Sequence, residues 1–454
     1  MTSPGVEAIA VALAGTGAPI RPGEPPDGVG GVVPACVAAP ATLDQVCGVM
    51  TAAAGLDLAV VPRGAGTTIS WGLPPARCDV VADLSRMDHV LEYAAGDLVV
   101  RVEAGVRLGQ LAEVLAEKGQ RLALDGPPAA TLGGVVATNA AGPLRLRYGL
   151  PRDLLIGITI VRADGERAKA GGKVVKNVAG YDLGKLFAGS RGTLGLIAEV
   201  TFRLHPLPEL SAYVTGQFAE SAAAAEAVLA AAASPLQPTA VELDRPRAGG
   251  PIHVATLLEG TPSGVSARAE RMRTVLGHGA KTTMAAPDWW GQLGEAASGS
   301  AGGSAGGSAG SGPAAVVAGG TLVRVASWAA ELRPVLDAID TVAAESGVAV
   351  AVGGSAGAGV LYVLLAADQD PEQVTVFVRA LRAATGHGVA GPGAAGPGAA
   401  GPARGGVVVL TAPATVLGAV DPWGPVPSLG LMRAVKQQFD PRNLMAPGRG
   451  PGGI

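Results

Sequence analysis

Three glycine-rich segments interrupt the first half of the chain, and the first and the third lie next to a predicted strand. They cover residues 62–72, 124–149 and 171–195 of 454. Glycine has no Cβ, so the backbone can turn sharply at these positions and approach another segment or a ligand closely. Because so many glycines are costly unless that close approach is used, the segments favour a ligand-holding fold. Clustered strands with helices inserted between them predict the α+β class.

The first segment, PRGAGTTISWG, follows a predicted buried strand at Leu58–Val61. Successive N–H groups in such a turn form a concave nest for phosphate oxygens. The segment lacks the Gly-Lys-Ser/Thr end of a Walker A loop and the third glycine of a Rossmann fingerprint. A tight surface loop is the alternative. The candidate ligand-binding residues are Pro62, Arg63, Gly64, Ala65, Gly66, Thr67, Thr68 and Ser70.

The second segment contains TLGG, in which Thr131 is a plausible cap for a short helix that begins near Gly133 and Gly134. Free N–H groups at the start of such a helix bind anions. Small residues at this point explain close helix packing equally well, and that alternative stays open. The candidate ligand-binding residues are Pro127, Thr131, Gly133, Gly134, Ala137, Thr138 and Gly142.

The third segment, GGKVVKNVAGYDLGKLFAGSRGTLG, leads into a predicted strand that begins at Leu196. Gly195 and Ile197 are candidate ligand-binding residues. Lys176 and Tyr181 are the polar candidates for chemistry. The alternative has Lys176 in a structural ion pair, and it has Asp182 as the cap of the next helix.

Three stretches of the chain resemble a known family. RLRYGLPRDLLIG (residues 145–157), KNVAGYDLGKLFAGSRGTLG (176–195) and FDPRNLMAPGR (439–449) resemble the PCMH-type FAD-binding domain of the vanillyl-alcohol oxidase family. The resemblance covers roughly residues 28–208 and the C-terminal tail. Within the family, the chain looks most like the FAD-binding subunits of bacterial glycolate oxidases. D-lactate and other 2-hydroxyacid dehydrogenases are wider relatives.

The resemblance implies non-covalent FAD and a PCMH-type domain of two α/β subdomains, followed by an α+β cap domain. The first two glycine segments would hold the pyrophosphate. The third would close on the adenosine beside the flavin ring, near Lys176 and Tyr181 as candidate catalytic residues. A histidyl–flavin bond is not expected at residues 62–72, which contain no histidine.

The resemblance, together with the change in composition beyond residue 208, implies four regions. We expect an N-terminal lead-in helix at 1–27, the FAD-binding domain at 28–208, the cap domain at 209–430 and a tail at 431–454 that packs on the FAD-binding domain. The Gly/Ala/Ser/Pro tracts at 298–312 and 388–406 should be flexible parts of the cap domain.

The chain departs from the catalytic members of the family that it resembles. It has no H-x-G-D-G-N motif, Arg191 stands where those members usually carry an acidic residue, and Ala446 stands where the familiar tail has asparagine. A lone histidine is more often structural than catalytic. His253 is the best candidate base if the chain works alone; the other histidines are His89, His205, His278 and His387.

Electrons that leave a flavin in this chain need an acceptor. The chain has three cysteines, no C-x-x-C spacing and therefore no predicted cluster, disulfide framework or metal site. The resemblance implies a catalytic flavoprotein subunit and an iron–sulfur subunit as partners in oxidising glycolate to glyoxylate. A stand-alone 2-hydroxyacid (D-lactate-like) dehydrogenase and a non-catalytic assembly subunit are the alternatives.

Charge and hydropathy exclude other classes of partner. The net charge is -3 without a basic stripe, which argues against nucleic acid. The N-terminus has no Lys or Arg before Arg21, and no apolar run is long enough to span a bilayer. We therefore expect a cytoplasmic protein that reaches the inner face of the membrane only through its partners.

Overall fold

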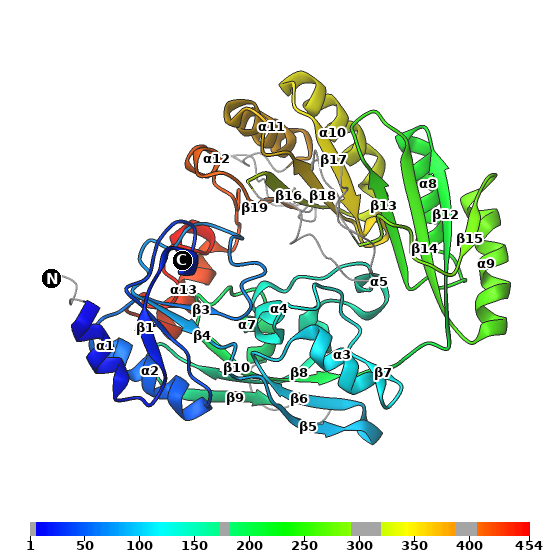
Figure 1. Ribbon diagram of the computed structural model, residues 1–454. Helices are drawn as coiled ribbons and strands as arrows, with labels where there is room; N and C mark the ends of the chain where they lie inside the picture. Colours follow the sequence, from blue (N-terminus) through cyan, green and yellow to red (C-terminus); the bar gives the residue numbers. More distant parts are fainter. Residues whose placement is uncertain (1–5, 173–181, 292–318, 387–405) are drawn as a thin grey trace, which may run out of the picture. The chain divides into compact units, whose positions relative to one another are not determined.

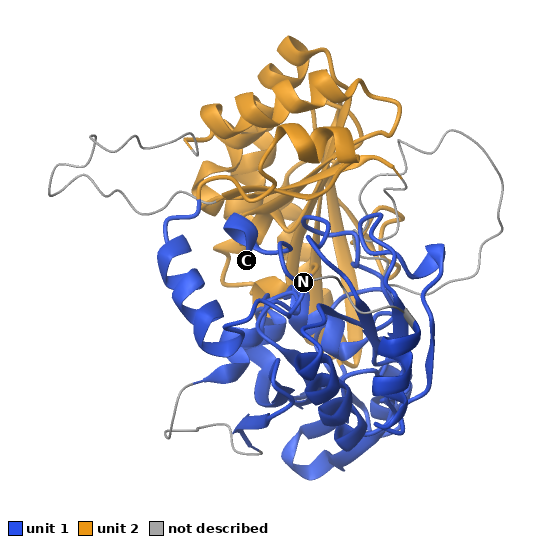
Figure 2. Ribbon diagram, turned by 90° about the vertical axis from the view of Figure 1, so that its left-hand side faces the viewer, with its two compact units in different colours: residues 1–141, 148–207, 426–454 blue, residues 142–147, 208–425 orange. Residues whose placement is uncertain are grey.

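The computed structural model describes residues 6–172, 182–291, 319–386 and 406–454. Lys176 and Tyr181, the tract at 298–312 and all but the last residue of the tract at 388–406 lie outside the described residues. The chain divides into two compact units (Figure 2). Unit 1 comprises residues 1–141, 148–207 and 426–454, and unit 2 comprises residues 142–147 and 208–425.

Unit 1 joins an N-terminal region, the central region with the glycine segments and the C-terminal tail. Residues 142–147 belong instead to unit 2, because the Ser355 hydroxyl donates to the Gly142 carbonyl at 3.2 Å and Leu146 packs on the unit 2 core. The strands of unit 1 are β1 (Ile20–Pro22), β2 (Cys36–Ala38), β3 (Val60–Arg63), β4 (Val80–Asp83), β5 (Val90–Ala94), β6 (Val99–Glu103), β7 (Gln120–Arg121), β8 (Leu155–Val161), β9 (Arg167–Gly171), β10 (Leu196–Arg203) and β11 (His205–Pro206). Its helices are α1 (Val6–Ala14), α2 (Leu43–Gly55), α3 (Leu108–Ala116), α4 (Leu132–Thr138), α6 (Pro151–Leu154), α7 (Leu183–Phe187) and α13 (Leu429–Phe439). Of α5 (Arg145–Tyr148), only the last residue belongs to unit 1.

Two sheets give unit 1 its frame (Figure 1). The first has the order β1-β2-β4-β3 with parallel pairing of β4 to both β2 and β3. The second is antiparallel with the order β5-β6-β10-β8-β9. A two-stranded sheet pairs β11 with β7.

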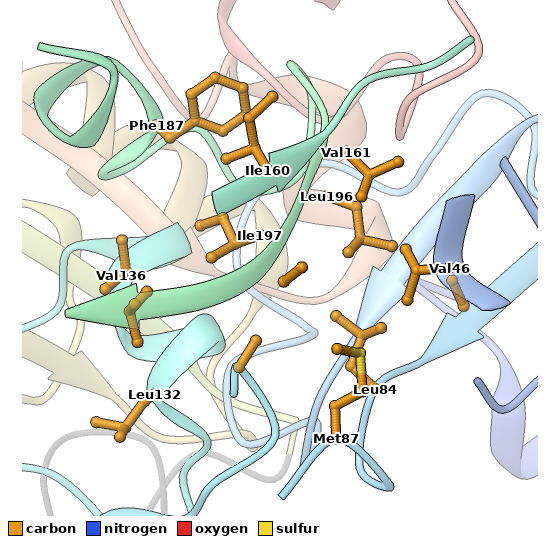
Figure 3. Packing of buried hydrophobic residues seen from close by; sticks show 14 of the residues in the cluster. Val46, Leu84, Met87, Leu132, Val136, Ile160, Val161, Phe187, Leu196 and Ile197 are labelled. Carbon is orange, nitrogen blue, oxygen red and sulfur yellow. The ribbon is translucent and has the colours of Figure 1, made fainter. Parts of the chain in front are cut away.

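A capping residue in the sequence explains where α2 begins. Thr42 caps α2, and its hydroxyl accepts the N–H of Gln45 at 3.2 Å. Gly55 is the last residue of α2. The left-handed conformation falls on Asp57, with φ 58°. Side chains from α2, α4, α7, β4, β8 and β10 fill one core (Figure 3), including Val46, Val136, Phe187, Leu196 and Ile197.

The described residues of unit 2 form an antiparallel sheet of eight strands, with the order β15-β12-β14-β13-β17-β18-β16-β19, and helices that pack on it. Its strands are β12 (Leu210–Phe218), β13 (Ala240–Arg245), β14 (Ile252–Gly260), β15 (Lys281–Thr283), β16 (Thr321–Ala326), β17 (Val350–Gly354), β18 (Val360–Leu365) and β19 (Gly406–Thr411). Its helices are α8 (Ser221–Ala232), α9 (Pro262–Leu276), α10 (Leu332–Ser346), α11 (Pro371–Ala384) and α12 (Ala414–Ala419). All five contribute apolar side chains to one core with the sheet.

Asp244 of β13 is 3% exposed, and burial raises its pKa to about 6 from 3.8. Folding therefore favours the protonated carboxyl, and the stability of the wild type should fall as pH rises from about 4 to about 6, relative to Asp244→Asn. The full shift corresponds to about 3 kcal/mol, an upper value. Urea denaturation at pH 4 and pH 7 measures it. An equal difference between the two proteins at both pH values would contradict the prediction.

Candidate functional site

The first glycine segment begins within β3, which lies at the edge of the first sheet. β3 pairs in parallel with β4, with Arg63 opposite Asp83. The loop then turns at Gly66, where φ is +74°. The backbone N–H groups of Ala65, Gly66, Thr67 and Thr68 have no acceptor among the described residues. They are therefore available to the oxygens of an anionic ligand.

The second glycine segment contacts the first one. A Cβ on Gly64 would lie 2.0 Å from the Thr131 hydroxyl oxygen, so the loop and the start of α4 touch where only glycine fits. Thr131 occupies the N-cap position, but its side chain makes no capping hydrogen bond, contrary to the prediction. The hydroxyl instead lies against Gly64.

The start of α4 is less open to an anion than the sequence indicates. The N–H of Leu132 donates to the Val106 carbonyl at 2.9 Å, and the N–H of Gly133 donates to the Ala104 carbonyl at 2.8 Å. A Cβ on Gly133 would lie 2.7 Å from the Cβ of Ala104. Close packing against the end of β6 therefore explains Gly133, and the loop at residues 65–68 supplies more free N–H groups than the helix does.

The third segment packs on the end of α4. The N–H of Gly189 donates to the Val136 carbonyl at 3.0 Å, and the N–H of Arg191 donates to the Ala137 carbonyl at 2.8 Å. Asp182 caps α7 by accepting the N–H of Lys185 at 3.1 Å, as the alternative for this residue predicted. The outcome for Lys176 and Tyr181 stays open, because both lie outside the described residues.

The C-terminal tail ties these segments together. Lys436 and Asp440 form a buried ion pair of 2.7 Å, and the Lys436 ammonium also donates to the carbonyls of Thr193 and Met445 at 2.8 and 2.9 Å. The Arg449 guanidinium, 4% exposed, donates to the carbonyls of Ile69 and Trp71 at 2.5 and 3.0 Å. Desolvation lowers the pKa of Arg449 to about 10.

These elements surround one pocket in unit 1, with about 760 Å³ of empty space that includes space open to solvent. Most of the predicted ligand-binding residues line it: Pro62, Arg63, Gly64, Gly66, Thr67, Thr68, Thr131, Gly133, Gly134, Ala137, Thr138, Gly195 and Ile197. Four do not line it: Ala65, Ser70, Pro127 and Gly142, the last of which belongs to unit 2. Lining residues that were not among the predicted ones are Ile69, Trp71, Leu84, Ala104, Arg191, Gly192 and Arg449.

The three pocket arginines differ in their surroundings. Arg63 forms ion pairs with Asp27 at 3.1 Å and Asp83 at 2.8 Å. The Arg21 guanidinium, helped by Arg63, holds the pKa of Asp27 well below its usual range. Arg191 adopts φ 55°, and its guanidinium carbon lies 6.0 Å from the centre of the Trp71 ring. This is within reach of a cation–π contact.

None of the histidines in the described residues lines this pocket. His89 contacts Glu103 at 2.8 Å, and His205 stacks edge-on with Tyr148 at 4.6 Å. His253 lies in unit 2, 6.4 Å from the ring of Trp289. No group of three metal-ligating side chains occurs among the residues that the structure describes.

Comparison with known proteins gives the fold its name. Residues 34–171 match the FAD binding domain family, and residues 425–449 match the C-terminal domain of FAD linked oxidases. The solved structure of p-cresol methylhydroxylase with substrate bound matches this chain with a TM-score of 0.65 and 16% identity, over 92% of this chain and 88% of that one. The chain has the PCMH-type FAD-binding fold. The predicted α+β class with a second, cap domain is confirmed.

Curated relatives share the sequence of about half of the chain. Glycolate oxidase subunit GlcD of Bacillus subtilis (strain 168) is 34% identical over 221 residues, 47% of this chain and 46% of that protein. The mitochondrial D-lactate dehydrogenase (cytochrome) of Arabidopsis thaliana is 34% identical over 211 residues, 46% of this chain and 37% of that protein. The matched part thus spans less than half the length of either relative.

The pocket suits FAD, the cofactor after which the matched domain family is named. Its loop offers free N–H groups for phosphate oxygens, while Leu84 and Ile197 supply apolar surface for a ring. Within the described ranges, no helix has the length and hydropathy needed to cross a bilayer.

Proposed function

We propose that the chain is the FAD-binding subunit of a glycolate oxidase-type complex, which oxidises a 2-hydroxy acid, glycolate to glyoxylate, and passes electrons to an iron–sulfur partner. The observation that carries the proposal is the convergence of three glycine segments and the tail on one pocket. The similarity to a glycolate oxidase subunit and to a D-lactate dehydrogenase supports the substrate class.

The chain's own residues have separable tasks in this proposal. The loop N–H groups from Gly66 to Thr68 bind the pyrophosphate, and Arg449 holds that loop through two carbonyls. Trp71 and Arg191 close one wall of the pocket. Bound non-covalently, FAD supplies the acceptor for a hydride from the substrate carbon.

A stand-alone 2-hydroxyacid dehydrogenase is the second candidate. The likeness to D-lactate dehydrogenases favours it. A non-catalytic assembly subunit is the third candidate. The loop N–H groups that have no acceptor argue against it, because they suit a bound phosphate. In either enzymatic case we propose a cytoplasmic protein whose contact with the membrane, where there is any, runs through its partners.

The visible absorption spectrum of the purified chain tests the proposal. We expect a flavin band that is released by heat or acid, because the bond to FAD is non-covalent. Glycolate, D-lactate and D-2-hydroxyglutarate are then added without oxygen, and the loss of the flavin absorption band (bleaching) is compared between them. Bleaching by one of them in the isolated chain identifies a stand-alone enzyme, and bleaching only with the partner subunits identifies a complex. A chain that has no flavin and takes up none would overturn both.

A further inference from the structure

The charged side chains that line the pocket of unit 1 are all positive. Arg63, Arg191 and Arg449 line it, and no carboxylate lines it among the described residues. Arg63 is balanced by its ion pairs with Asp27 and Asp83. What the pocket can bind therefore depends on whether its other positive charges are also balanced within the chain.

Arg449 has no counter-charge in the part of the chain that the structure describes. The titratable group that acts on its charge there is the thiol of Cys78. Burial raises the pKa of that thiol to about 12, so the thiol is neutral near neutral pH. Desolvation lowers the pKa of Arg449 only to about 10, which leaves the guanidinium protonated. The pocket wall thus holds a positive charge that the described chain does not balance.

Two other buried cations show how the chain usually balances such a charge. Lys436 pairs with Asp440 at 2.7 Å, and Arg245 pairs with Asp340 at 2.7 Å. Arg449 is as deeply buried, with 4% of its surface exposed. A buried charge without a partner is strongly unfavourable, so a bound anion is the natural source of the missing negative charge.

The guanidinium of Arg449 still has hydrogen-bond donors to offer. The two bonds that hold the loop, to the carbonyls of Ile69 and Trp71, are both made by Nη2. The Nε is buried without a hydrogen-bond partner in the described residues, and Nη1 donates to none of them. Because the donors of a guanidinium lie in one plane, they match a pair of phosphate oxygens. Arg449 can therefore bind an anion while it keeps both bonds to the loop.

The loop that Arg449 holds supplies neutral donors to the same pocket. The N–H groups of Gly66, Thr67 and Thr68 have no acceptor among the described residues, and all three residues line the pocket with Arg449. Successive backbone N–H groups bind phosphate oxygens, and arginine adds the charge that they lack. A diphosphate, with a negative charge on each phosphate, suits this combination.

We propose that Arg449 supplies the counter-charge of the diphosphate in the FAD site, with its Nε–H and Nη1–H donors on phosphate oxygens. The inference rests on the proposed function and gives the C-terminal tail a direct part in binding the cofactor. Because coupling between two binding events is reciprocal, the tail and the cofactor stabilise each other. Whatever the docked tail adds to the affinity for FAD, bound FAD adds to the docking of the tail.

The affinity of the flavin-free chain for FAD tests the charge. Fluorescence titration with FAD gives the dissociation constant. Arg449→Gln should weaken FAD binding at least about tenfold, because a charge-assisted contact is lost. Arg449→Lys keeps the charge without the planar fork and should weaken it less. Arg442→Gln removes a tail arginine that pairs with Asp57 outside the pocket, and it should bind FAD as the wild type does. Wild-type affinity in Arg449→Gln would overturn the proposal.

Competition by ADP locates the contact on the cofactor. ADP has the diphosphate of FAD but no flavin ring, so Arg449→Gln should weaken ADP by about the same factor as it weakens FAD. A loss of affinity for FAD alone would place the arginine at the flavin ring, contrary to the proposal.

Urea denaturation separates the charge from the hold on the loop. Without a ligand the charge of Arg449 is unbalanced, so flavin-free Arg449→Gln should unfold at the same urea concentration as the wild type or a higher one. With saturating FAD, the variant should be the less stable protein. An equal loss of stability with and without FAD would mean that Arg449 only holds the loop. A chain that never takes up FAD sinks the proposed function, whereas a wild type that binds FAD no better than Arg449→Gln sinks this inference alone.

Discussion

Replacing Lys436 with methionine should lower the free energy of unfolding by about 3–5 kcal/mol. The Asp440 carboxylate, 1% exposed, would remain buried without its cation, and the carbonyls of Thr193 and Met445 would each lose a donor. Methionine keeps the apolar stem of the side chain, so the loss reports on the charge. Urea denaturation followed by circular dichroism measures it.

An exposed ion pair of the same unit provides the control. Lys185 and Asp182 lie 3.4 Å apart with both side chains more than half exposed. Lys185→Met should cost less than about 1 kcal/mol, because solvent screens such a pair. If the two variants lost equal stability, the buried pair would not be what holds the tail on the rest of unit 1.

The second large effect is expected at the loop. Gly64→Ala should reduce the flavin content of the purified chain to less than about a tenth, if FAD is the ligand, because a Cβ would lie 2.0 Å from the Thr131 hydroxyl and push the loop off α4. Absorbance of the purified protein at the flavin band and at 280 nm, with added FAD, measures the content. Circular dichroism should show a retained fold.

Two further variants separate contact from backbone effects. Adding Thr131→Ala removes the oxygen that the new Cβ meets and leaves the Thr131 Cβ at 3.0 Å, so the double variant should regain most of its flavin. Gly55→Ala in α2 meets nothing within 4 Å and should bind flavin as the wild type does. No rescue in the double variant would mean that Gly64 acts through its own flexibility.

Local signals in the sequence identified much of the pocket. A loop after a predicted strand, a T-x-G-G turn and a glycine-punctuated segment brought thirteen of the predicted residues to one place. Leu84 and Ala104 had no such signal, because they follow β4 and β6 as ordinary small or apolar residues. The tail motif indicated Arg449, but only the fold shows that it holds the loop through Ile69 and Trp71.

The sequence by itself determined the fold class and the segments that approach a ligand, because glycine spacing and hydrophobic periodicity are local properties of a chain. Only the tertiary structure decided which of the N–H groups stay free. Gly133 is used in packing against Ala104, while the N–H groups of residues 65–68 have no acceptor within the described structure. The sheet of unit 2 also needed the fold, since its strand order depends on pairings between strands that are far apart in sequence.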